Sequence, residues 1–150
     1  MMNFLFGVLL VIAGQSSGGR EQAPDLTGRW KVEFTFLATE KHELEFDAKA
    51  SGAGTFLLLD ARSNLLPPAE PAKATWKRVD SSQVTFSGEI EFPIGNVGRN
   101  PGILVFKGRF ESQTSISGSA AFFAQGQNPN DAKSVPAKTG KFTAERVAAK

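Results

Sequence analysis

The chain of 150 residues contains no cysteine and a single histidine, His42. Without cysteine it cannot form a disulfide, offer a thiolate nucleophile or bind a metal through sulfur. A serine triad would have to be built around His42, and a metal site with several histidine ligands cannot be built at all. We therefore expect no metal, no cofactor and no enzymatic activity.

The sequence also lacks a large excess of positive or negative charge. The formal net charge is only +2, and the lysines are scattered along the chain, mostly at outward positions of the predicted strands. A nucleic-acid-binding domain concentrates its basic residues on one face. The sequence therefore predicts a solvated surface and no nucleic-acid partner.

Long apolar runs are absent except at the N terminus, where residues 4–13 are unbroken in their apolar character. This run is about half of the ~20 residues needed to cross a bilayer, but it suits the centre of a secretory signal. We predict a signal peptide at 1–19, a linker at 20–24 and one domain at 25–150, with an uncleaved anchor as the alternative. The expected location is secreted or periplasmic, without stable membrane insertion after signal removal.

Alternation of apolar and polar residues is the main pattern in the rest of the chain. At its start, Trp30, Val32, Phe34 and Phe36 alternate with charged or polar residues. This period of two is typical of a strand with one buried and one wet face. Its repeats predict eight strands, at residues 29–37, 42–50, 54–60, 73–79, 83–92, 102–111, 114–124 and 138–147. No substantial helix is predicted after the signal segment, so the fold class is all-β.

Glycine in mid-strand helps to choose the architecture. Gly88, Gly108 and Gly118 each lie within a predicted strand and in its inward phase. Such glycines weaken a flat sheet, but they permit the sharp coiling that a small closed barrel needs. With mostly short connections, they predict an eight-stranded antiparallel up-and-down barrel. An open sandwich of the same strands is the alternative.

The predicted connections differ in length. Stretches rich in proline, glycine or asparagine at 61–72, 93–101 and 125–137 are predicted to be long loops, and the other connections are short. In an up-and-down barrel these three loops gather at one rim. Because loops carried by a rigid scaffold often hold binding residues, we expect binding at this rim.

The opposite end of the barrel carries a recognisable pattern. Gly28 and Trp30 open the first predicted strand, and Arg146 lies in the same phase near the end of the last. If these strands are neighbours, the guanidinium lies across the indole and closes the barrel. Over residues 25–147 the chain resembles the lipocalin-like barrels of the calycin superfamily, which also includes avidin-like and fatty-acid-binding proteins. Most secreted lipocalins have disulfides and a helix after the barrel, so their absence favours a shorter, avidin-like or bacterial lipocalin-like kind.

The predicted interior is rich in phenylalanine. This lining either fills the barrel or surrounds an apolar cavity, because eight strands give an interior near the size at which both occur. In the second case a small apolar or amphipathic ligand enters at the long-loop rim. The residues predicted to contact it are His42, Asp60, Trp76, Phe36, Phe56, Phe106, Phe122 and Arg99. His42 and Asp60 share the inward phase at that rim, where they could hold or protonate the ligand.

A filled interior leads to a different function. The protein is then a structural or protein-interaction barrel with no small-molecule ligand. The strand at 54–60 is apolar on both faces, so we expect a loop or a protein partner to cover its outer side. A third hypothesis, an enzyme that uses His42 and Asp60, lacks a recognisable nucleophile.

Overall fold

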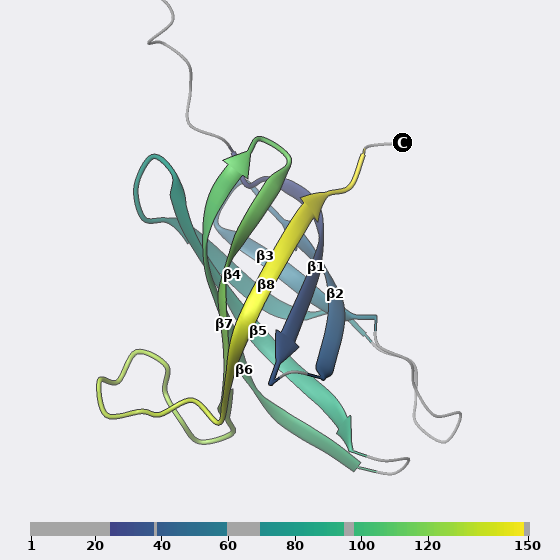
Figure 1. The fold of residues 1–150 in the computed structure, drawn as a ribbon, viewed down its shortest axis with the longest axis vertical. Helices are drawn as coiled ribbons and strands as arrows, with labels where there is room; N and C mark the ends of the chain where they lie inside the picture. Colours follow the sequence, from purple (N-terminus) through teal and green to yellow (C-terminus); the bar gives the residue numbers. More distant parts are fainter. Residues whose placement is uncertain (1–24, 38, 60–69, 95–97, 149–150) are drawn as a thin grey trace, which may run out of the picture.

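The computed structural model describes residues 25–37, 39–59, 70–94 and 98–148, and every regular element in them is a strand. The strands are β1 (Gly28–Phe36), β2 (Glu40–Ala48), β3 (Ala53–Leu58), β4 (Ala72–Arg78), β5 (Gln83–Ile94), β6 (Gly98–Ser112), β7 (Ser115–Ala124) and β8 (Lys138–Arg146). Each strand pairs antiparallel with the next, and β8 also pairs with β1, which closes the sheet (Figure 1). The predicted all-β, eight-stranded up-and-down barrel is confirmed. No helix able to cross a membrane occurs in the described ranges.

The strand register places the buried residues of all eight strands on the same face of the sheet. Trp30 on β1 lies opposite Phe46 on β2 and opposite Arg146 on β8. Even-numbered residues likewise face even-numbered ones along the regular part of every ladder, as Phe86 on β5 faces Phe106 on β6. Because side chains alternate between the two faces of a strand, the apolar even-numbered residues all point into one interior.

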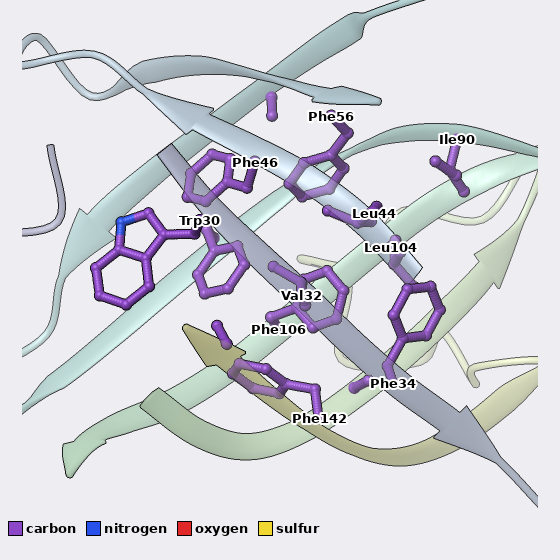
Figure 2. Packing of buried hydrophobic residues seen from close by; sticks show 14 of the residues in the cluster. Trp30, Val32, Phe34, Leu44, Phe46, Phe56, Ile90, Leu104, Phe106 and Phe142 are labelled. Carbon is purple, nitrogen blue, oxygen red and sulfur yellow. The ribbon is translucent and has the colours of Figure 1, made fainter. Parts of the chain in front are cut away.

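Aromatic rings fill that interior. In a ring of eight strands β1 lies opposite β5, and Phe34 on β1 meets Phe92 on β5 with 6.2 Å between ring centroids. Phe86 stacks on Phe46 at 4.6 Å and on Phe106 at 4.9 Å. These five side chains are at most 4% exposed, and Figure 2 shows Phe34, Phe46 and Phe106 packed between the strands. The barrel therefore has a packed aromatic core.

Inward-facing glycines lie where these rings need room. A Cβ atom on Gly88 would come within 2.8 Å of Cδ2 of Phe56, and one on Gly108 within 2.7 Å of Cζ of Phe142. Both distances are shorter than ordinary carbon contacts, so a side chain there would displace the ring. Glycine at these positions thus makes space for the rings and for the neighbouring strand, because a Cβ atom on Gly88 would also come within 2.7 Å of Cβ of Ala74 and 2.8 Å of the carbonyl oxygen of Lys73.

One end of the barrel is closed by Trp30 and Arg146, as predicted. Trp30 is fully buried, and its Nε1 donates a hydrogen bond to the carbonyl of Leu26 at 2.7 Å. The guanidinium carbon of Arg146 lies 4.4 Å from the indole centroid, within the range of a cation–π interaction. The guanidinium also donates hydrogen bonds to three backbone carbonyls, those of Asp25, Thr27 and Gln113. Arg146 therefore joins both ends of the domain.

Gly28 completes this closure. Its φ of +128° lies in the region that favours glycine, and a Cβ atom there would come within 2.9 Å of Nη1 of Arg146. A larger residue would be strained and would also push the guanidinium away from Trp30. The structure thus brings Gly28, Trp30 and Arg146 together at this end of the barrel.

The predicted loop at 93–101 is wrong. There β5 and β6 continue as a two-stranded hairpin with Pro93 opposite Arg99, and the hairpin extends beyond the rim of the barrel (Figure 1). Proline is excluded from central strands, because it has no backbone N–H to donate to the neighbouring strand on each side. The pairing of β5 with β4 stops at Gly88 and that of β6 with β7 at Gly102, so each strand of the hairpin has only one partner. Proline is tolerated on such a strand.

The other connections agree more closely with the sequence. No strand occurs over 125–137, as predicted, whereas most of the predicted loop at 61–72 lies outside the described residues. The second strand begins two residues earlier than expected, at Glu40, because Leu37 turns the chain with a φ of 56°. The predicted signal peptide and linker, at 1–24, also lie outside the described residues.

Replacing Arg146 with lysine tests the closure. Lysine keeps the positive charge but cannot reach three carbonyls at once or lie flat on Trp30, so we expect a loss of about 2 kcal/mol in the free energy of unfolding. Urea unfolding measures this change. The matched control is Arg29→Lys, because Arg29 has a side chain 56% exposed and only a 4.0 Å contact with Glu45. Equal effects of the two substitutions would contradict the closure.

Candidate functional site

Three polar side chains meet at the long-loop rim, where β2 and β8 both begin. Nε2 of His42 lies 2.9 Å from Oε2 of Glu40, and Nζ of Lys138 donates a hydrogen bond to the same oxygen at 2.6 Å. The two strands lie on either side of β1, whose last residue, Phe36, is opposite Glu40 on one side and Gly140 on the other. This arrangement brings Lys138 to a carboxylate 98 residues away in the chain.

This polar cluster of Glu40, His42 and Lys138 rests directly on the aromatic core. The imidazole centroid lies 4.5 Å from the ring of Phe92 and 5.2 Å from the ring of Phe34. The side chain of His42 is only 12% exposed as a result. The cluster therefore forms a polar layer between the core and the rim.

The electrostatics of the cluster favour an ionised Glu40. Partial burial alone would raise the pKa of its carboxyl group, but the hydrogen bonds and charges of Lys138 and His42 outweigh burial and hold the pKa below its ordinary value. A carboxylate that accepts two such bonds orients both donors. The cluster can accordingly present the ammonium of Lys138 and the imidazole of His42 to a polar or anionic group at the rim.

Of the other residues predicted for the site, Phe36 and Phe122 lie nearest to this cluster. Both are fully buried, and both contact Phe92, at centroid distances of 6.4 and 5.1 Å. Phe56 and Phe106 contact each other at 5.8 Å, deeper in the core. These rings are brought together, but as members of the packed interior.

The remaining predicted residues are not assembled with them. Trp76 lies at the opposite, closed end, where its Nε1 donates a hydrogen bond to the carbonyl of Lys49 at 2.8 Å. Arg99 pairs with Pro93 through the β5–β6 ladder, and its side chain lies outside the described part of the structure. Asp60 is itself outside the described residues.

Glu40 and Lys138 were not predicted as site residues. The predicted second strand begins at His42, although Glu40 has the same phase as His42 and lies two residues before it. The phase that Glu40 shares with His42 is the feature of the sequence that could have identified Glu40 as a site residue. The pairing with Lys138 could not be read from the sequence, because it depends on the register of β2 and β8 against β1.

A metal-dependent role finds no support at this cluster. Within the described ranges, no group of three or more histidine, cysteine, aspartate or glutamate side chains is placed to hold a metal ion. The cluster itself combines one carboxylate and one imidazole with an ammonium, which is a cation and cannot act as a ligand. Its chemistry is that of hydrogen bonding and ion pairing.

Replacing Glu40 with glutamine tests the electrostatics of the cluster. A carboxyl group whose pKa is lowered on folding contributes stability above its ordinary value of 4.5 and loses it as the pH falls through the lower value. We expect Glu40→Gln to cost about 0.5–1 kcal/mol at pH near 7 and nothing at pH near 2, measured by urea unfolding. The exposed Glu89→Gln control should change stability by less than about 0.5 kcal/mol at either pH. A cost of Glu40→Gln that persists unchanged in acid would contradict this account.

Comparison with known proteins adds no family assignment. No protein-family model, no curated protein and no solved structure matches the chain. The architecture therefore stands on its own strand pairing and core, and any role of the rim has to be argued from its contacts.

Proposed function

We propose that the protein is an exported, non-enzymatic binding module of lipocalin-like shape, whose packed barrel is a scaffold for partners on its outer surface and rim. The observation that carries this proposal is the stacking of Phe46 on β2 against Phe86 on β5, three strands apart around the barrel, at 4.6 Å. At the rim, Phe34 meets Phe92 of the β5–β6 hairpin at 6.2 Å. A barrel that encloses a ligand needs open space between its walls. A packed interior directs binding to the outside.

Other parts of the proposal rest on separate observations. The closure of Trp30 by Arg146 supports the lipocalin-like shape, and the apolar run at 4–13 supports export. Exposed apolar side chains give a protein partner points of contact. They are Leu59, 42% exposed at the end of β3, and Val135, 72% exposed in the loop at 125–137.

A second candidate function is binding of a small amphipathic molecule at the long-loop rim. The favouring observation is the polar cluster of Glu40, His42 and Lys138 directly above the buried rings of Phe36 and Phe92. An anionic head group would pair with Lys138, and an apolar tail would have to displace part of the aromatic layer. That displacement costs packing energy, so this function ranks second.

Native mass spectrometry of the full purified protein, together with organic extraction, separates the two functions. We expect the mass of the chain alone and no apolar compound in the extract at a comparable molar amount. Two variants locate any bound compound, Lys138→Met at the rim and Lys77→Met on the outer surface. A compound that co-purifies with the wild type and with Lys77→Met but not with Lys138→Met would overturn the packed-scaffold proposal in favour of the rim ligand.

A further inference from the structure

Lysines that are scattered in the sequence line up on the outside of the barrel. The strand register places them in one continuous row, in which lysine alternates with a hydroxyl residue. The row, in order from β4 to β2 across the β8–β1 seam, is Lys77, Thr85, Lys107, Ser119, Lys141, Thr35 and Lys41. It crosses seven of the eight strands. We call it the lysine–hydroxyl row.

The lysines of this row differ from most of the others that lie on strands or beside them, although Lys73 on β4 is likewise exposed and without an ion pair among the described residues. Lys31, Lys49 and Lys138 each form an ion pair with a carboxylate, at 3.1, 3.4 and 2.6 Å. All four lysines of the row are exposed, and none of them has an ion pair among the residues that the structure describes. Their ammonium groups are therefore available to an external anion.

The surface along the row is hollowed. A hollow of about 1270 Å³ is lined by the four members of the row on β4 to β7, and the loop at 125–137 borders it through Asn128 and Pro129. A second hollow, of about 750 Å³, is lined by the three members on β8, β1 and β2. The row thus runs along two shallow, open depressions of the outer surface.

Over most of its length the row is flanked by uncharged or basic residues. On β4 to β7 the next outward row on one side is uncharged and consists of Thr75, Ser87, Val105 and Ala121. On the other side the next outward row consists of Gln83, Arg109, Ser117 and Thr143, on β5 to β8. Acidic residues, Glu33 and Glu43, adjoin the row at β1 and β2. Glu111 also lines the larger hollow, where it accepts a hydrogen bond from Ser117. Such a positive strip attracts an anionic partner.

We propose that the lysine–hydroxyl row binds a linear acidic polysaccharide, which deepens the proposed function by naming the partner of the outer surface. Neighbouring strands are about 4.8 Å apart, so successive lysines lie about 10 Å apart, comparable to one disaccharide of an extended chain. Each lysine would pair with a carboxylate of the polymer, and each serine or threonine between two lysines would hydrogen-bond sugar hydroxyls. The alternation of the row matches a polymer with one charge per disaccharide.

Other anionic partners fit the row less well. Single-stranded nucleic acid uses exposed aromatic side chains for stacking, but Phe123, the aromatic residue of the larger hollow, is only 9% exposed. A membrane is flat and touches one side of a barrel. The row instead winds from Lys77, beside the turn at the closed end, to Lys41 at the long-loop rim. A flexible linear chain can follow that path.

Binding of hyaluronan, which has one carboxylate per disaccharide, tests the proposal by titration calorimetry at low and moderate salt. The test variant is the triple substitution Lys77→Gln, Lys107→Gln and Lys141→Gln. We expect it to weaken binding on the order of tenfold or more and to make log K depend less steeply on the logarithm of the salt concentration. Thermal unfolding of the variant checks that these exposed substitutions leave the fold intact.

A matched control changes the net charge equally at lysines outside the row, with Lys49→Gln, Lys73→Gln and Lys133→Gln. It should weaken hyaluronan binding by less than about threefold. The proposal is overturned if the wild type does not bind hyaluronan at low salt or if both triple variants lose affinity equally. It is also overturned if single-stranded DNA, polyglutamate or anionic phospholipid vesicles bind more tightly. In each case the packed-scaffold function stands unless native mass spectrometry finds a rim ligand.

Discussion

Contact between aromatic rings that come from opposite walls is the constraint on which the rest of this structure depends. A barrel of eight strands is just wide enough for side chains to fill. Phe46 on β2 stacks on Phe86 on β5 inside it, and Phe34 meets Phe92 where the β5–β6 hairpin leaves the barrel. Rings of this size leave no room for a Cβ atom on the wall beside them, which accounts for Gly88 and Gly108. The interior is therefore a packed aromatic core.

The two ends of the barrel are finished in different ways. At the closed end a single side chain, Arg146, covers Trp30 and ties the first and last strands to the turns beside them. At the other end Glu40 accepts hydrogen bonds from Lys138 and His42, so polar groups that satisfy one another cover the aromatic core. Arg146 uses Nε, Nη1 and Nη2 on backbone carbonyls, whereas the Lys138 ammonium has two N–H donors besides the one that Glu40 accepts.

Strand positions, the inward phase and the closure could be predicted because each depends on a period of two that is visible in the sequence. The hairpin around Pro93 could not, since the rule against proline assumes a strand with neighbours on both sides. The contact of Glu40 with Lys138 and the alignment of Lys107 with Lys141 depend on register across several ladders. A shift of one residue in any ladder would turn such side chains to the other face, and composition does not fix that shift.

A crystal structure of the protein under xenon pressure would test most directly whether the barrel is a packed scaffold. Xenon enters dry apolar cavities, so its position reports space that side chains leave empty. The account predicts no xenon between Phe34 and Phe92 or elsewhere along the barrel axis, with both rings in contact. An ordered xenon atom at the centre of the barrel, or rings separated by an elongated bound molecule, would contradict it.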